Sequence, residues 1–155
     1  MSKQSFTHVA LAVADIDTSV DFYRRFASME VVHERKGETG ARTVWMNDRH
    51  LPFVLVLFEA AGASPLRRIA RAVSRRLPAV AHLGIACESR EQVDSLCALA
   101  RSERRLRRAP RDAGRIVGYY GMIFDPDGYN LEVSFGQLTP PIGQPGGESQ
   151  PSRTK

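Results

Sequence analysis

Two pairs of histidine and glutamate recur at matched spacing in the two halves of this chain. Glu59 follows His8 by 51 residues, and Glu132 follows His82 by 50 residues. Imidazole nitrogens and carboxylate oxygens are ligands for Zn, Ni, Co, Mn or Fe(II), and two carboxylates balance the charge of a divalent cation. We therefore predict that His8, Glu59, His82 and Glu132 hold one divalent metal ion, with positions left for water or substrate oxygens.

The parity of the predicted strands decides whether these side chains can meet, because alternate residues of a strand point to opposite sides of its sheet. His8 and His82 both lie opposite the alternating Val, Leu and Ile positions of their strands, which are expected to face a helix. Glu132 likewise lies opposite the Leu, Val and Phe positions of its strand. These three residues are therefore predicted to share the open side of the sheets.

Glu59 is the ambiguous member, because its strand, residues 51–59, is apolar on both faces. We assign it to the open side together with the alternate apolar residues of that strand. The cavity would then be apolar on one side and polar on the other, which favours a small, partly apolar substrate with an oxygen chelate. Two tyrosines, Tyr119 and Tyr120, are included as candidate hydrogen-bond donors to the substrate, with packing within the strands as their alternative role. The predicted substrate-binding residues are Phe53, Leu55, Leu57, Tyr119, Tyr120, Asn130 and Ser134.

The order strand, helix, strand, strand, strand is predicted twice along the chain. Residues 15–18 offer caps for the first helix, where Thr18 with Asp21 resembles a capping box, and Ser89 with Gln92 forms a capping box for the second helix. We therefore predict an α+β fold of two βαβββ modules that make one functional domain. The predicted divisions are 1–60 for the first module, 61–78 for a basic linker helix, 79–136 for the second module and 137–155 for a flexible C-terminal tail.

Composition narrows the class of protein. The 155 residues are 43% hydrophobic, which is enough for one compact core. The start of the sequence lacks a secretory signal, and no apolar stretch is long enough to span a membrane. Two cysteines without framework spacing fit a reduced protein better than a disulfide scaffold. We therefore expect a cytoplasmic protein without a membrane partner.

The net charge of +5 comes with two arginine-rich runs, at residues 67–76 and 101–111. Aromatic residues are not interleaved with these arginines, so the stacking platforms of single-strand binders are missing. We interpret both runs as solvated helix faces, with a strand expected near residues 106–108 of the second run, and predict a small-molecule substrate and no nucleic-acid partner.

The motifs together resemble the vicinal oxygen chelate superfamily, which includes glyoxalase I, extradiol ring-cleavage dioxygenases, fosfomycin-resistance transferases and bleomycin-binding proteins. The resemblance covers residues 5–136 and rests on the stretches 7–13, 20–23 and 125–132 and on the strand around His82. It implies two βαβββ modules whose curved mixed sheets surround an open metal-binding cavity, commonly in a homodimer.

Carried over by position, the resemblance implies a role for each candidate ligand. His8 and His82 match the first-strand ligands of the two modules, Glu132 matches the last-strand ligand, and Glu59 matches the extra ligand typical of glyoxalase I. Dioxygenases and fosfomycin transferases are implied to use only the equivalents of His8, His82 and Glu132. Glu59 therefore discriminates between activities, and the ligands could come from one chain or from two.

Three functions fit such a site. The first is a glyoxalase-like lyase or isomerase that acts through an enediolate, with Glu132 or Glu59 moving the proton and the metal as Lewis acid. The second is an Fe(II) extradiol-type ring-cleavage dioxygenase that uses His8, His82 and Glu132. The third is a non-catalytic protein of the bleomycin-resistance type, which would sequester a drug or an aromatic ligand in the same cavity.

Overall fold

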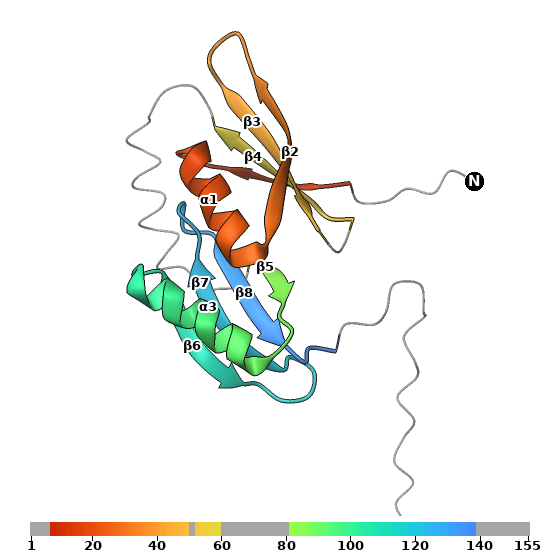
Figure 1. The fold of residues 1–155 in the computed structure, drawn as a ribbon, viewed down its shortest axis with the longest axis vertical. Coiled ribbons are helices and arrows are strands. Elements are labelled where there is room, and N and C mark those ends of the chain that lie inside the picture. The colour runs from red at the N-terminus through yellow and green to blue at the C-terminus, as the bar shows by residue number, and fades with distance from the viewer. Residues whose placement is uncertain (1–6, 50–51, 60–80, 139–155) are drawn as a thin grey trace, which may run out of the picture.

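The chain folds into two βαβββ modules that lie end to end along the long axis of the molecule (Figure 1). The structure, a computed structural model, describes residues 7–49, 52–59 and 81–138. The first module consists of β1 (Val9–Ala12), α1 (Ile16–Ala27), β2 (Met29–Lys36), β3 (Arg42–Asp48) and β4 (Val54–Glu59). The second consists of β5 (His82–Ala86), α3 (Arg90–Ser102), β6 (Leu106–Asp112), β7 (Tyr119–Phe124) and β8 (Asn130–Phe135). The predicted α+β class and its repeated module are confirmed.

Each module forms its own four-stranded mixed sheet, and the two sheets share one topology. The strand orders are β1-β4-β3-β2 and β5-β8-β7-β6. The first strand of each module pairs in parallel with the last, and the other pairs are antiparallel. β1, which directly follows His8, and β5, which begins with His82, are therefore both edge strands.

Local sequence explains how the helices begin. The N-cap of α3 is Ser89, whose hydroxyl oxygen accepts a hydrogen bond from the backbone N–H of Gln92 at 3.2 Å, as predicted. The N-cap of α1 is Asp15, whose carboxylate accepts from the N–H of Thr18 at 2.7 Å and has its pKa lowered by that bond. Of the caps predicted at residues 15–18, Asp15 is therefore the one that the helix uses, and Thr18 lies in its first turn.

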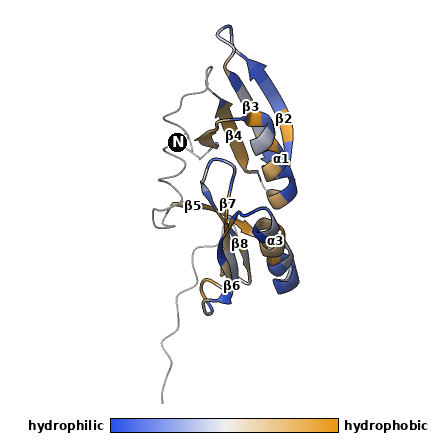
Figure 2. Ribbon diagram, turned by 90° about the vertical axis from the view of Figure 1, so that its left-hand side faces the viewer, coloured by the Kyte–Doolittle hydropathy of each residue, from blue (hydrophilic) through white to orange (hydrophobic). Residues whose placement is uncertain are grey.

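The helices cover one face of the sheets and leave the other open. The core contains Phe22, Tyr23 and Phe26 of α1 and Val93, Cys97 and Ala100 of α3, packed on strand residues such as Leu57 and Val133. Val56, Tyr120 and Met122 are also buried but lie outside this core. We call the sheet surface that carries these three residues the open face. Figure 2 shows β4 in hydrophobic colours and β2 as largely hydrophilic.

The turn between β7 and β8 joins the two modules. Asp127 accepts hydrogen bonds from the backbone N–H of Ala14 at 2.9 Å and from the hydroxyl of Ser19 at 3.2 Å. Asp125, which is fully buried, accepts from the hydroxyl of Tyr23 at 3.0 Å. Gly128 completes the turn at φ 93°, a conformation that glycine adopts without strain. The Asp-Pro-Asp-Gly motif therefore ties the last hairpin of the second module to α1.

Two of the predicted segments lie outside the described residues: the linker helix at 61–78 and the tail at 137–155, apart from its first two residues. Cys87 and Cys97 are both free, and burial raises the pKa of the Cys97 thiol to about 11. In the described part of the chain, neither helix has the length and apolar character needed to cross a bilayer.

Candidate metal and substrate site

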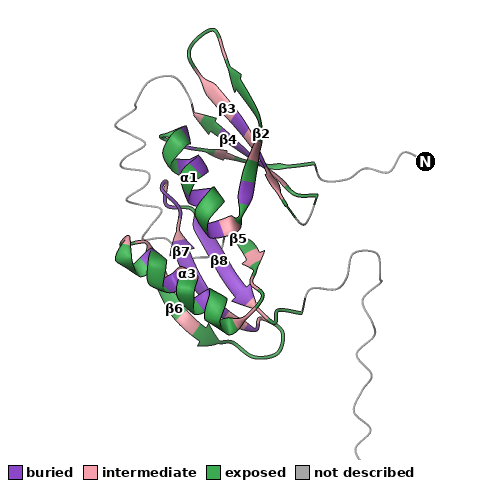
Figure 3. Ribbon diagram, viewed as in Figure 1, coloured by how far each residue is buried: buried purple, intermediate pink, exposed green. Residues whose placement is uncertain are grey.

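His82 and Glu132 come together on the open face of the second module. His82 lies beside Asn130 in the β5–β8 ladder, and Glu132 lies two residues further along β8. Their side chains approach to 3.6 Å between Nε2 and Oε2. Glu132 is only 6% exposed because β8 is buried along most of its length (Figure 3), whereas the side chain of His82 is 36% exposed. One nitrogen and one oxygen donor are thus placed side by side.

The amide of Gln137 also reaches the Glu132 carboxylate, with 3.5 Å between Nε2 and Oε1. Both contacts are long for hydrogen bonds, so they compensate only part of the cost of burying a carboxylate. In the described ranges, no Lys or Arg side chain forms an ion pair with Glu132, and its basic neighbour is the imidazole of His82. The site therefore has the electrostatic character of one that would accept a cation.

The register of the first module shows which residue there corresponds to Glu132. Val9 lies beside Leu55 in the β1–β4 ladder, so His8 extends that ladder at the level of Val54. The residue two positions beyond Val54 is Val56. Val56 therefore occupies the position that Glu132 has in the second module, and the first module presents an imidazole without a neighbouring carboxylate.

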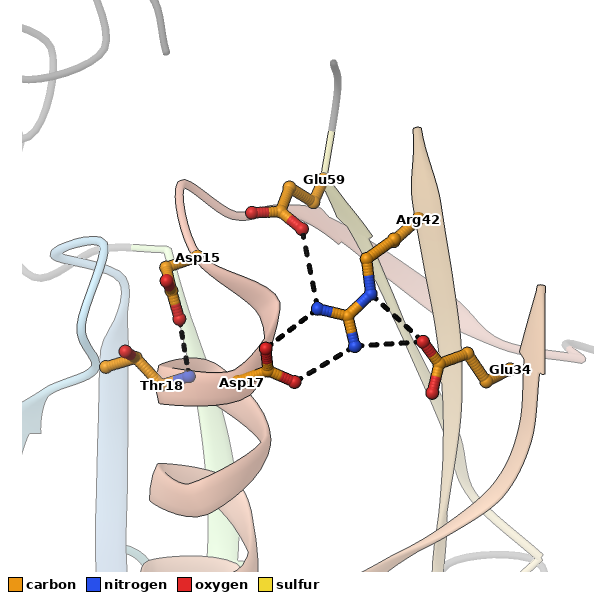
Figure 4. Close-up of polar contacts among 6 residues, drawn as sticks. All are labelled: Asp15, Asp17, Thr18, Glu34, Arg42 and Glu59. Carbon is orange, nitrogen blue, oxygen red and sulfur yellow. Dashed lines mark hydrogen bonds and ion pairs between the residues drawn. The ribbon is translucent and has the colours of Figure 1, made fainter. Parts of the chain in front are cut away.

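Glu59 lies on the other side of its sheet. It pairs with Arg42 of β3 and shares strand parity with Leu57, which is fully buried beneath α1. Arg42 donates two hydrogen bonds to the carboxylate of Asp17 in α1, at 2.8 and 2.9 Å, and two to Glu34 of β2 (Figure 4). Glu59 Oε2 lies 4.0 Å from the same guanidinium. The structure thus joins Glu59 to a surface ion-pair cluster rather than to the histidines.

The parity that we assigned to β4 is wrong. Leu55 and Leu57 are fully buried in the core beneath α1, so they cannot line an open cavity. The open side of β4 carries Val56, which is 7% exposed, and Phe58, which is 43% exposed. Phe53 precedes the strand and is 37% exposed. One face of β4 packs on α1 and the other belongs to the open face, and both carry apolar side chains. Hydropathy alone therefore cannot tell which face is which.

The predicted substrate-binding residues of the second module divide in the same way. Tyr119 donates a hydrogen bond at 2.7 Å to Asp94 of α3, so it belongs to the helix side and its predicted role is wrong. Tyr120 lies beside Ser134 in the β7–β8 ladder and shares the open face with Glu132. Asn130 and Ser134 are 9% and 2% exposed on that face. Tyr120, Asn130 and Ser134 thus surround the pair formed by His82 and Glu132.

Three arginines of β6 border the same face. Arg107 donates to the side-chain oxygen of Asn130 at 2.6 Å. Arg108 and Arg111 donate to the hydroxyl oxygen of Tyr120. These residues lie on β6, which agrees with the strand expected near residues 106–108 and extends it to Asp112, so a solvated helix face describes only the start of the run at 101–111. The run at 67–76 lies outside the described residues.

The four predicted ligands do not converge within one chain. Across residues 7–49, 52–59 and 81–138, no three His, Cys, Asp or Glu side chains gather closely enough to hold one metal ion. The ring of His8 lies 2.9 Å from the hydroxyl of Thr7 at the exposed start of β1. The chain itself therefore brings together one histidine and one glutamate of the four.

Comparison with known families identifies the class of this protein. The model of the Glyoxalase/Bleomycin resistance protein/Dioxygenase superfamily matches residues 5–133. The chain belongs to this superfamily, as its motifs and its repeated module suggested. It is also 38% identical over 149 residues to the uncharacterized protein PA2024 of Pseudomonas aeruginosa, an alignment that covers 95% of this chain and 96% of the relative.

Solved structures share the fold at lower identity. A glyoxylase/bleomycin resistance protein/dioxygenase domain from Frankia superposes with a TM-score of 0.65 at 20% identity, over 88% of this chain and 100% of that domain. A mutant of the fosfomycin resistance protein FosX from Listeria monocytogenes, complexed with Mn(II) and 1S,2S-dihydroxypropylphosphonic acid, gives a TM-score of 0.64 at 15% identity, over 88% and 96% of the two chains. At these identities the likeness establishes the shared fold alone.

Proposed function

We propose that this chain is a divalent-metal enzyme acting on a small, partly apolar substrate that chelates the metal through two neighbouring oxygens. His82 and Glu132 would hold the metal from one chain, and His8 of a second copy would complete a set of three ligands. The observation that carries the proposal is the 3.6 Å approach of His82 Nε2 to the buried Glu132 carboxylate. Membership of the superfamily, and the Mn(II) bound by the FosX relative, agree with it.

The donor set fits such an ion. Nitrogen and oxygen ligands lie about 2.1 Å from a transition metal, which puts two neighbouring ligands roughly 3 Å apart. The observed separation of 3.6 Å would close to that value with a small side-chain adjustment. A divalent ion would also offset the cost of burying Glu132, which its neighbours compensate only in part. The candidate metals remain Zn, Ni, Co, Mn and Fe(II).

A second copy is the natural source of the third ligand. β1 and β5 are edge strands, and each pairs with only one neighbour in its sheet. Their open sides carry small, exposed residues: Ala10, Ala12, Gly84 and Ala86. Unpaired edges of this kind are ready to pair with another chain, and identical chains commonly form twofold dimers. A homodimer that joins β1 of one chain to β5 of the other would bring His8 toward His82 and Glu132.

When bound, a divalent ion supplies Lewis acidity to the substrate oxygens. His82 and Glu132 would bind the ion and fix its position on the open face. The side-chain amide of Gln137 would donate a hydrogen bond to Glu132 Oε1 and hold the orientation of that carboxylate. Asn130 and Tyr120 present polar groups on the same face. With these parts the first candidate reaction is a redox-neutral lyase or isomerase reaction, in which Glu132 or a neighbouring group accepts the proton.

The second candidate is ring cleavage by an Fe(II) dioxygenase, and one observation favours it specifically. The first module has Val56 at the position equivalent to Glu132, and Glu59 lies beside the guanidinium of Arg42 instead. The proposed ligand set therefore contains a single carboxylate. A set of two histidines and one carboxylate leaves open positions for a chelating substrate and O2, as in non-haem iron oxygenases. Oxygen uptake with a panel of catechols after anaerobic Fe(II) loading distinguishes the two reactions. Uptake identifies the dioxygenase, and its absence across the panel favours lyase or isomerase chemistry.

Metal binding is the primary test. Purified protein is stripped with chelator, and each divalent ion is titrated while the melting temperature and bound metal are measured. We expect saturable binding that raises the melting temperature and that is lost in His82→Ala. His33→Ala is the matched control, because His33 is also exposed but packs against Trp45 in the first module. Stoichiometric metal binding by His82→Ala, or no binding by any ion, would overturn the proposal and favour sequestration of a drug or an aromatic ligand.

Mixing two inactive variants tests whether the site is shared. His8→Ala and Glu132→Ala homodimers should each fail to bind metal tightly. After subunit exchange, each mixed dimer would contain one site with intact His8 from one chain and intact Glu132 from the other. Recovery of up to one metal ion per mixed dimer supports a shared site, whereas no recovery despite proven exchange means that all ligands come from the same chain.

A further inference from the structure

Two arginines of β6 converge on a single phenol oxygen of the open face. Arg108 donates to the hydroxyl oxygen of Tyr120 through Nη1 at 2.9 Å. Arg111 donates to the same oxygen through Nε at 3.2 Å and through Nη2 at 2.9 Å. Two positively charged groups are therefore gathered around one neutral acceptor.

This convergence depends on an irregularity in β6. Residues three apart in a regular strand point to opposite sides. The β6–β7 ladder shifts register between Arg108 and Arg111, so that they lie beside Met122 and Tyr120, two residues apart on β7. Arg111 also stacks its guanidinium 5.4 Å from the centre of the Tyr120 ring. The irregularity thus directs both arginines to the same face of the sheet.

Their charges are not balanced by carboxylates. Among the described residues, Arg25, Arg42, Arg49, Arg90 and Arg105 each form an ion pair with an Asp or Glu. Neither Arg108 nor Arg111 has such a partner in the same part of the chain. Guanidinium groups match planar or tetrahedral oxyanions, which they bind through paired N–H donors. A pair of arginines that is held in place but lacks a carboxylate suits an anionic ligand.

We propose that Arg108, Arg111 and Tyr120 form a subsite for an oxyanion group of the substrate, either a carboxylate or a phosphate or phosphonate. The inference rests on the proposed function for its link to catalysis, since it names the substrate class of that site. The arginines would bind the anionic oxygens, and Tyr120, whose oxygen accepts from both, would turn its own O–H toward the ligand.

The ladder gives the offset along the strands between this subsite and the candidate metal ligands. Tyr120 lies beside Ser134, and Met122 lies beside Glu132, so the two rows are two residues apart. Two residues of an antiparallel strand span about 7 Å. Arg108 and Arg111 also lie on β6, two strands across from β8 at about 5 Å per strand, so the substrate would carry its anionic group at the opposite end from the two oxygens that chelate the metal.

Anion binding is tested on metal-free, full-length protein, so that the metal cannot contribute. Inorganic phosphate and acetate are titrated at constant ionic strength with sodium chloride, and the arginine side-chain N–H signals are followed by NMR. We expect saturable shifts of Arg108 and Arg111. Tighter binding of phosphate identifies a phosphate or phosphonate substrate, and tighter binding of acetate identifies a carboxylate.

The variants separate a built subsite from general surface charge. Arg111→Gln should weaken the preferred anion about tenfold or more, because a hydrogen bond to a charged group contributes roughly 1.5–3 kcal/mol. Tyr120→Phe should weaken it less. Arg101→Gln removes an exposed arginine from the last turn of α3 and is the matched control, expected to bind as the wild type does.

Unsaturable shifts, equal binding by Arg111→Gln and wild type, or equal loss in Arg101→Gln would overturn the subsite. If the wild-type protein binds the anion but no divalent metal, the proposed metal site is overturned and the anion subsite stands. The reverse result, metal binding with no anion site, would overturn this inference alone.

Discussion

Val56 in the first module and Glu132 in the second occupy the same place in two ladders of the same topology, yet one is apolar and the other ionisable. The difference extends to the neighbouring strand. Trp45 lies beside Val56, and its ring is 5.0 Å from that of His33. Met122 lies beside Glu132, and the next residue on that face is Tyr120 with its two arginines. The first open face is aromatic and apolar around Val56, and the second has a carboxylate at the matching place with two arginines nearby.

The two modules agree on the face that packs against a helix and differ on the open face. Both modules need the same helix side, since each must bury a sheet under one helix, and their core residues correspond accordingly. The open faces carry no such requirement and are free to differ. If the two faces meet across a dimer, the first would contact the apolar part of a substrate and the second would bind its charged and chelating groups. An amphipathic, anionic substrate follows from that division.

The largest effect should come from removing the Glu132 carboxylate, with removal of the Glu59 carboxylate as its control. Glu132→Ala removes a proposed ligand and should abolish activity and weaken metal binding by more than about 100-fold, since loss of outer-shell groups alone costs 10–100-fold. Glu59→Ala leaves the open face intact and should bind metal as the wild type does. Calorimetric titration of stripped protein with the preferred metal measures both. Equal losses in the two variants would restore Glu59 to the ligand set.

A stability difference checks the two faces of β4. Leu57 is fully buried in the core, so Leu57→Ala should lower the free energy of unfolding by about 2–5 kcal/mol. Phe58 is 43% exposed on the open side, and Phe58→Ala should cost less than about 1 kcal/mol. Urea denaturation at fixed protein concentration gives both values. The opposite ranking would mean that β4 is turned over in its sheet.

The sequence was sufficient for the fold because its patterns recur. The alternation around His8 and His82, the cap at Ser89 and the turn before Tyr129 all have local physical causes, and each is found where it was expected. Ambiguity arose where two local solutions are equally good. Asp15 and Thr18 can both cap α1, and only the structure shows that Asp15 does so.

The site was less accessible to such reasoning. Parity placed His82 and Glu132 on one side, and the structure brings them together. It failed on β4, where both faces are apolar, and it could not relate Arg108 to Arg111 because a register shift overrides their spacing. The strand expected near residues 106–108 continues to Asp112, and the proline at position 110, which is tolerated on edge strands, agrees with the place of β6 at the edge of its sheet.

The contact between the modules should give stability a pH dependence. Burial raises the pKa of Asp125 to about 6 from an ordinary value of 3.8. The folded state then binds more protons than the unfolded state between these values, so the free energy of unfolding falls as pH rises from about 4 to 6 and this contribution is flat above. The loss should approach about 3 kcal/mol. Denaturation of the wild type and of Asp125→Asn across pH 4–7 measures it.

Asp125→Asn keeps oxygen and hydrogen-bonding capacity beside Tyr23 but cannot ionise, so its stability should lack this slope. Asp127→Asn is the matched control, because Asp127 belongs to the same turn and contacts α1 through Ser19. Parallel slopes for the wild type and Asp125→Asn would show that the buried carboxyl does not govern the pH response.

The smallest effect concerns a position where the helix sides of the two modules differ. Gly121 lies beside Val133, at the place where the first module has Val44 beside Leu57. A Cβ at Gly121 would come within 2.3 Å of Cys97 Sγ and 3.4 Å of the Arg108 carbonyl oxygen. Gly121→Ala should therefore cost about 1–3 kcal/mol through overpacking, measured by urea denaturation.

The control for this substitution is Gly37→Ala, where the added Cβ would meet only the Ala41 carbonyl oxygen at 3.5 Å, an ordinary contact. Combining Gly121→Ala with Cys97→Ala removes the sulfur and should recover part of the loss, since residues in contact are energetically coupled. Additive costs in the double variant would mean that the sulfur of α3 is not what keeps this position a glycine.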